Sequence, residues 1–355
     1  MNPNSTAIRR RIGAGLVMLG MIGYLSRLAA ADGQFQYTIY YDSNPLEATD
    51  EVTPAVGHSI RGLTRQKHVY GQLTGEFTLL GQAFIEPMLP YETKGIVSPN
   101  LRLKYNISPT FSVNWNFTAF SKAYTKQSGA YRRCESEPYL VFLPYRPLQI
   151  LLSARNSKKT LHIPARLHFV ETDFTMRASY SYREHYLLEL SFAERTIQHK
   201  DLLAYDVCTT DCDSLEAIGP RSDHGILTTL HLRYRGKFIT GLSLGSTKMR
   251  SNSLGRHYKS WIVNCYASAS LSERSFIHLS LRRIDKQYRS TGISDIDYYV
   301  DPEEPLQNLV HIRYEHKYGK QHIAYLQLSM LQNETTVSRI YYNKTLIEIG
   351  TKYNF

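Results

Sequence analysis

Basic side chains recur at every second residue in several stretches of the chain. Arg102 and Lys104 lie two residues apart, as do His311 and Arg313. Because successive side chains of an extended strand point to opposite faces, residues of this spacing share one face. Arginine presents a planar fork that suits carboxylate and phosphate, so a row of such residues can bind or guide anions. The candidates are Arg102, Lys104, Arg177, His231, Arg233, Arg235, Arg282, His311, Arg313 and Lys317.

A minority of acids shares this face, namely Glu189, Glu315 and Glu348. The face is therefore polar with a positive balance. Two alternatives to anion binding stay open. The charges can form a network that satisfies itself inside a closed or plugged structure, or some arginines can lie at a rim against lipid phosphates.

The pair Asp223 and His224 is the nearest match to a catalytic arrangement. Adjacent residues of a strand point to opposite faces, which argues against their acting together. No set of nucleophile, base and orienting group meets the geometric roles that a mechanism requires. We therefore predict no catalytic residue. An enzyme would need the segment 199–223 to fold over a cleft that holds both residues and a hydroxyl nucleophile.

The four cysteines give no strong metal signature. Cys208 and Cys212 share the longest predicted connection and can form a disulfide in an oxidising compartment. A metal site beside Asp206 is the alternative, but the sequence has no second ligand pair with zinc spacing. No metal or other cofactor is predicted. We expect Cys134 in a loop and Cys265 at a lipid-facing strand position.

The elements that must position these residues are strands, because the dominant hydrophobic period from Gln34 onward is two. The clearest case sets Val113, Trp115 and Phe117 against Asn114 and Asn116. About sixteen strands are expected, with fourteen as the alternative, because alternation weakens at 57–72 and 138–165. The expected strands are 34–43, 57–66, 72–86, 97–108, 110–125, 138–144, 147–156, 165–182, 185–198, 224–235, 237–250, 258–272, 275–288, 307–318, 321–333 and 341–355.

The connections between these segments alternate in length. Tight turns, as at Ser108 and Pro109, are followed by longer polar connections. Short turns on one rim and long loops on the other are typical of an antiparallel up-and-down transmembrane β-barrel, with the short turns periplasmic. The expected long connections are 44–56, 87–97, 126–137, 199–223, 251–257, 289–306 and 334–340.

Residues 1–31 have the order of a secretory signal peptide. Arg9, Arg10 and Arg11 precede an apolar stretch from Ile12 to Leu25, and small residues follow up to Ala31. The apolar stretch is shorter than the roughly 20 residues of a spanning helix. We therefore expect the signal peptide to be removed and residues 32–355 to form the barrel.

The end of the chain carries a resemblance to a known class. Apolar and polar residues alternate through the last strand, which ends with Tyr353 and Phe355 on one face. This end resembles the C-terminal signal of Gram-negative bacterial outer-membrane β-barrel proteins, which the barrel-assembly machinery reads. The resemblance implies an all-β fold, a porin-like architecture and a location in the outer membrane. It identifies no subfamily.

These observations favour an outer-membrane channel for small, anionic solutes. The net charge of +11 is consistent with an anionic partner, and outer-membrane lipid and lipopolysaccharide are the expected neighbours. Nucleic acid fits an exported chain poorly. Two other functions stay open: an exit barrel for polysaccharide or surface proteins, and an outer-membrane enzyme of lipid or peptide. The oligomeric state is not predicted.

Overall fold

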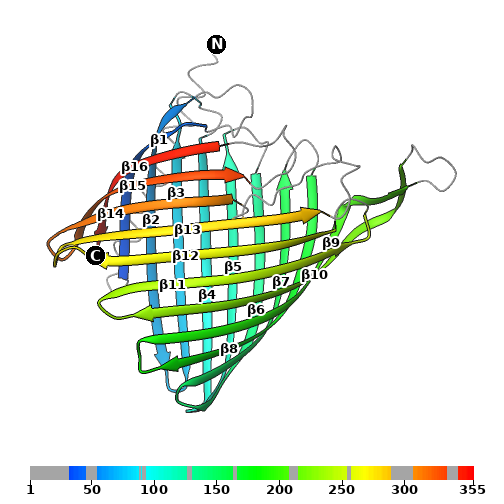
Figure 1. Ribbon diagram of the computed structural model, residues 1–355, viewed down its shortest axis with the longest axis horizontal. Coiled ribbons are helices and arrows are strands. Elements are labelled where there is room, and N and C mark those ends of the chain that lie inside the picture. Colours follow the sequence, from blue (N-terminus) through cyan, green and yellow to red (C-terminus); the bar gives the residue numbers. More distant parts are fainter. Residues whose placement is uncertain are drawn as a thin grey trace.

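The protein is a closed β-barrel. The computed structural model describes residues 32–44, 54–87, 89, 93–125, 130–162, 166–207, 215–253, 257–288, 307–333 and 343–355. Within these residues each strand pairs antiparallel with its neighbours in sequence, and the first strand pairs with the last. Figure 1 shows the tilted strands of the two walls crossing in projection, with the short turns along one rim.

The described part of the chain contains sixteen strands. They are β1 (Asp32–Asp42), β2 (Ala55–Tyr70), β3 (Leu73–Ile85), β4 (Lys94–Ser108), β5 (Phe111–Tyr124), β6 (Ala130–Tyr145), β7 (Leu148–His162), β8 (Arg166–Tyr182), β9 (Tyr186–Val207), β10 (Leu215–Arg235), β11 (Phe238–Ser251), β12 (Tyr258–Ser270), β13 (Ser275–Tyr288), β14 (Gln307–Tyr318), β15 (His322–Asn333) and β16 (Asn343–Asn354).

The prediction of sixteen strands is confirmed, and the alternative of fourteen is wrong. The chain turns sharply at Gly71, whose positive φ of 58° is a conformation that glycine adopts without strain. This turn separates β2 from β3 inside a stretch where alternation is weak. β6 begins at Ala130, before the second weak stretch at 138–165, so the expected connection 126–137 is mostly strand. Cys134, which was expected in a loop, therefore lies within β6 and is exposed.

The expected connection 199–223 is also wrong, because β9 and β10 continue through most of it. Their pairing extends from Tyr186 and Tyr234 to Val207 and Leu215, with register shifts near Gly219 and Pro220. In Figure 1 this hairpin projects beyond the rim of the barrel. The strands were not predicted because this part of the sequence is polar, and a hairpin beyond the membrane needs no apolar face. Cys208, Cys212 and the predicted signal peptide 1–31 lie outside the described residues.

The outer face of the barrel is apolar and exposed. Trp115, Phe174 and Trp261 are 53%, 59% and 63% exposed, and exposed Leu, Ile, Val and Phe side chains occur on most strands. An apolar surface this extensive is stable against lipid rather than water. Tyrosines beside the short turns, including Tyr70, Tyr105, Tyr182, Tyr186, Tyr234 and Tyr318, form an interfacial aromatic belt. Among the described residues, no helix is long and apolar enough to cross a membrane.

The seam between β1 and β16 is closed by the end of the chain. The backbone N–H of Phe355 donates to Gly33 O at 3.0 Å, and Gly33 N–H donates to Phe355 O at 3.0 Å. The ring of Phe355 covers Gly33, where a side chain would overlap it. Tyr353 stacks on Phe355 with 6.1 Å between ring centroids. The two residues of the predicted assembly signal thus complete the last strand pair.

Candidate functional site

The inner face of the barrel is defined by the strand register. In β5, Asn114 is buried while its neighbours Val113 and Trp115 are exposed on the outer side. Asn114 pairs with Lys104 of β4 and Tyr139 of β6, so these residues face inward as well. The same parity can be followed from strand to strand around the closed sheet.

This register assigns the ten basic candidates to the inner face. Arg177 pairs with Ser191, His231 pairs with Ser243, and Arg282 pairs with Asn264. The remaining candidates occupy positions of the same parity on β4, β10 and β14: Arg102, Lys104, Arg233, Arg235, His311, Arg313 and Lys317. The structure therefore brings together on one surface residues that are far apart in the sequence.

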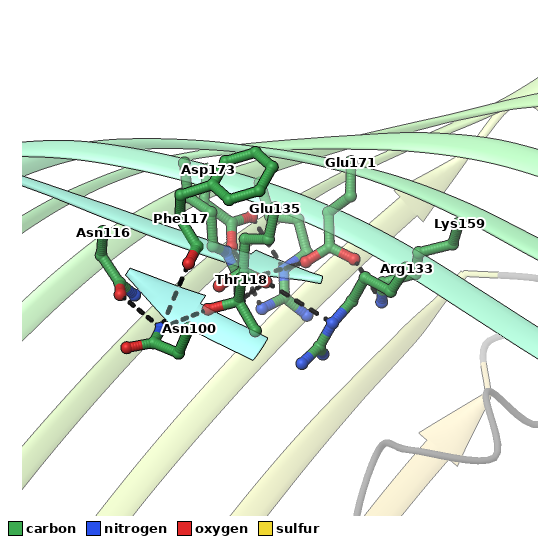
Figure 2. Close-up of polar contacts among 11 residues, drawn as sticks. Asn100, Asn116, Phe117, Thr118, Arg133, Glu135, Lys159, Glu171 and Asp173 are labelled. Carbon is green, nitrogen blue, oxygen red and sulfur yellow. Dashed lines mark hydrogen bonds and ion pairs between the residues drawn. The ribbon is translucent and has the colours of Figure 1, made fainter. Parts of the chain in front are cut away.

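An ion-pair network spans β6 to β9 on this face, and Figure 2 shows part of it. We call it the wall cluster. It consists of Arg133, Glu135, Arg155, Lys159, Glu171, Asp173 and Arg195. Four bases surround three acids, so the cluster carries a net positive charge.

Arg155 is the centre of the wall cluster. Its guanidinium lies 3.6 Å from Glu135 Oε2 and 2.7 Å from Glu171 Oε1, and it also donates to Asp173. Lys159 Nζ lies 2.9 Å from Glu171 Oε2. Arg195 Nε lies 3.0 Å from Asp173 Oδ1. Each carboxylate therefore has at least two cationic partners, which compensates for the loss of water around it.

A second network, the seam cluster, joins β13 to β16. It consists of His278, Arg313, Glu315, Tyr325 and Lys352. Arg313 Nε is 2.7 Å from Glu315 Oε1, Lys352 Nζ is 3.4 Å from the same oxygen, and the guanidinium carbon of Arg313 lies 3.9 Å from the centroid of the Tyr325 ring. The buried Tyr325 hydroxyl accepts from Gln36 Nε2 at 2.7 Å and bonds to Thr38. This cluster ties the closing strands together.

The two signs of charge differ in their exposure to the lumen. The side chains of Glu76, Glu171 and Asp173 are 14%, 4% and 6% exposed. Those of Arg65, Arg102 and Arg177 are 51%, 59% and 45% exposed. In the pairs of Glu76 with Arg65 and Arg102 the base is by far the more exposed partner, so these sites present positive charge to the lumen. In the wall cluster both signs are largely buried, since Lys159 and Arg195 are 7% and 17% exposed.

Asp223 and His224 do not act as a pair. Asp223 faces inward, where Arg221 Nη2 donates at 2.7 Å and His199 Nε2 lies 3.1 Å from Asp223 Oδ2. His224 faces outward and lies 3.0 Å from Glu194 Oε1. Within the described residues, no group of three or more His, Cys, Asp or Glu side chains is arranged to hold a metal ion.

Sequence reasoning missed the wall cluster, although a signal existed. Arg155, Ser157 and Lys159 alternate with outward residues, and Glu171 and Asp173 do the same on the next strand. The expected strand 147–156 ended too early to include Lys159, and Glu135 was placed in a connection. Near the rim opposite the short turns, charged residues occur on both faces of the strands and weaken the hydrophobic period. The wall cluster was missed for this reason.

Comparison with models of known protein families gives no match, and neither does comparison with curated protein sequences. Solved structures do match. The chain is similar to OmpT, an outer membrane protein of Vibrio cholerae in its trimer form, with 10% identity, a TM-score of 0.52, and coverage of 92% of this chain and 99% of that chain. The chain is also similar to a mutant porin of Rh. blastica, with 10% identity, a TM-score of 0.41, and coverage of 92% of this chain and 99% of the porin. The similarity to OmpT shows that this chain has the fold of the outer-membrane β-barrels, and its apolar outer face places it in such a membrane.

Proposed function

We propose that the barrel forms a water-filled passage across the outer membrane for small anionic solutes. Closed barrels of about sixteen strands enclose more space than their own side chains fill. The inner face of this barrel is lined by polar and charged residues, as a passage for hydrophilic solutes requires. The apolar outer face keeps the wall in lipid.

The observation that carries the proposal is the unequal exposure of the two signs of charge. Glu76 is held by Arg65 at 2.5 Å and lies 3.9 Å from Arg102, and both arginines extend into the lumen. Arg177 Nε lies 3.4 Å from Glu189 Oε1 and is likewise about half exposed. A solute on the barrel axis therefore meets guanidinium groups before it meets carboxylates.

Three more basic residues, which lie near the short turns, contribute in the same direction. Arg233, Arg235 and Lys104 are exposed on the inner face. Basic rings of this kind lower the energy of an anion in a pore and raise that of a cation. Arginine also suits carboxylate and phosphate solutes better than halide, because its donors are arranged as a fork.

Planar-bilayer recording tests the proposal. Under a KCl gradient, the reversal potential of the wild-type protein is expected to show preference for chloride. Substitution of Arg102→Gln, Arg177→Gln and Arg233→Gln together is expected to shift it toward the cation-selective side. Lys158→Gln, on the outer face, is the matched control and is expected to leave it unchanged.

Two outcomes would contradict the proposal. One is an absence of conductance from correctly folded protein, which would indicate a plugged lumen. The other is a reversal potential that the triple variant and the wild type share, since the exposed arginines would then have no part in selectivity.

A further inference from the structure

The inner face of β10 to β13 differs from the rest of the lumen in its lack of acids. Among the described residues, the inward positions from Gly225 to Arg235 on β10, and all those of β11 to β13, carry no carboxylate. Glu189 of β9 lies beside this wall but is held by Arg177 Nε at 3.4 Å. Arg233 is exposed here, and its two register partners are a glycine and a leucine. Its positive charge therefore meets the lumen without an acid on either neighbouring strand position.

Two aromatic rings lie over β11, because the inward residues Gly241, Ser243 and Gly245 are small. The ring of Tyr266 covers Gly241, where an added Cβ would lie 2.2 Å from Cε1 of the ring. His231 Nδ1 lies 2.6 Å from Ser243 Oγ. The two rings are nearly parallel, with 19° between their planes and 6.3 Å between their centroids. Both side chains are only partly buried, so together they present an aromatic surface to the lumen.

Polar groups stand on both sides of these rings. Arg233 is the direct register partner of Gly241, so it emerges beside the position that the Tyr266 ring covers. On the next row Asn264 Oδ1 accepts from Arg282 Nε at 2.9 Å. An amide, a hydroxyl and an imidazole each have further donors or acceptors beyond one such bond. We call the combination the Tyr266 site: His231, Arg233, Ser243, Asn264 and Tyr266.

The chemistry of the Tyr266 site distinguishes between classes of anion. The fork of Arg233 suits a carboxylate. The face of an aromatic ring is partly negative and attracts the C–H groups on the face of a sugar ring. An aromatic acid would displace water from the hydroxyl, imidazole and amide groups without replacing their hydrogen bonds, which costs free energy. A ring that carries both hydroxyl groups and a carboxylate satisfies all parts of the site.

We propose that the Tyr266 site binds sugar acids of the hexuronate class as they cross the barrel. The inference rests on the proposed passage and names the class of anion that it takes. The pyranose ring packs on Tyr266, its hydroxyl groups bond with Ser243 and Asn264, and the carboxylate binds Arg233.

Isothermal titration calorimetry with methyl β-glucuronide tests the proposal on the purified, folded protein in detergent. The methyl group keeps the sugar ring closed. Three comparison ligands each lack one feature: methyl β-glucoside lacks the carboxylate, gluconate lacks the closed ring, and benzoate lacks the hydroxyl groups. We expect each of them to bind the wild type at least about fivefold more weakly than the glucuronide.

Substitutions separate the ring from the charge. Tyr266→Leu is expected to weaken glucuronide binding about fivefold, whereas Tyr266→Phe keeps the ring and most of the affinity. Tyr258→Leu is the matched control, because Tyr258 lies on the same strand and face but Lys286 Nζ already lies 4.1 Å from its ring centroid. Arg233→Gln is expected to weaken binding about tenfold. Arg102→Gln, on β4, should retain the affinity within about twofold, since salt screens a distant charge.

Equal binding of the glucuronide and the glucoside would overturn the proposal, as would equal losses for Tyr266→Leu and Tyr258→Leu. The comparison of ligands on the wild type remains decisive if Tyr266→Leu does not fold. The binding measurement needs no conductance, so it separates the two proposals. A protein that conducts chloride but does not bind the glucuronide would refute the Tyr266 site alone, and selective binding without conductance would refute the passage alone.

Discussion

Replacement of Arg155 by alanine removes the centre of the wall cluster. Three carboxylates lose a partner at once, because Glu135, Glu171 and Asp173 all contact its guanidinium. Lys159 still neutralises Glu171, and Arg195 still contacts Asp173. Among the described residues of the cluster, Glu135 then keeps the more distant Arg133, whose Nε lies 3.8 Å from Glu135 Oε2. The substitution therefore leaves the charge of Glu135 poorly compensated and removes one cationic partner each from Glu171 and Asp173.

The expected cost follows from the burial of the acids. Breaking a buried ion pair by removing one partner costs about 3 to 5 kcal/mol, because the remaining charge has lost its water. The remaining cations in the cluster place Arg155→Ala at the lower end, about 3 kcal/mol. Arg177→Ala is the matched control, because its pair with Glu189 is half exposed and pairs of this kind contribute at most about 1 kcal/mol.

Urea titration of the protein inserted in lipid vesicles measures both variants. The fluorescence of Trp115 and Trp261 reports the loss of the lipid-facing environment. We expect the free energy of unfolding to fall about three times further for Arg155→Ala than for Arg177→Ala. Equal losses for the two variants would refute the reasoning, since they would show that the acids of the wall cluster are as well hydrated as Glu189.

Two further substitutions test contacts of inward-facing tyrosines. Gly241→Val places a side chain where the Tyr266 ring lies, and we expect it to lower the free energy of unfolding by about 1 to 3 kcal/mol in the same titration. Gly95→Val is the control. Its side chain enters open space, so it should have little effect. Tyr325→Phe removes the hydroxyl that bonds to the buried Thr38 and accepts from the amide of Gln36. We expect the free energy of unfolding to fall by about 1 to 2 kcal/mol. A variant as stable as the wild type would show that the seam cluster does not hold the closing strands together.

The fold was predictable because lipid outside and water inside impose a strict period on each strand. The segment Phe111 to Phe117 shows this period without interruption, and its strand is correct to one residue at each end. The prediction failed where the membrane no longer imposes the pattern. The β9–β10 hairpin extends beyond the rim, and its polar residues from His199 to Asp223 gave no alternation to read.

The candidate site was predictable only in part. Inward positions such as Arg102 and Arg313 follow from parity within one strand. The pairing of Arg155 with Glu171 or Asp173 depends on the register between strands, which single-strand patterns do not contain. The burial of the carboxylates beneath arginines, which supports the proposed selectivity, depends on that register too.

Paired cysteine substitutions on β8 test the central claim, that neighbouring residues of a strand face a water-filled lumen and lipid. Arg177→Cys and Ala178→Cys would be made in a background where Cys134, Cys208, Cys212 and Cys265 are serine. We expect a charged, membrane-impermeant thiol reagent to modify Arg177→Cys and to reduce its conductance in a planar bilayer, and to leave Ala178→Cys unchanged. Equal modification of the two variants, or modification of Ala178→Cys alone, would contradict the assignment of the inner face.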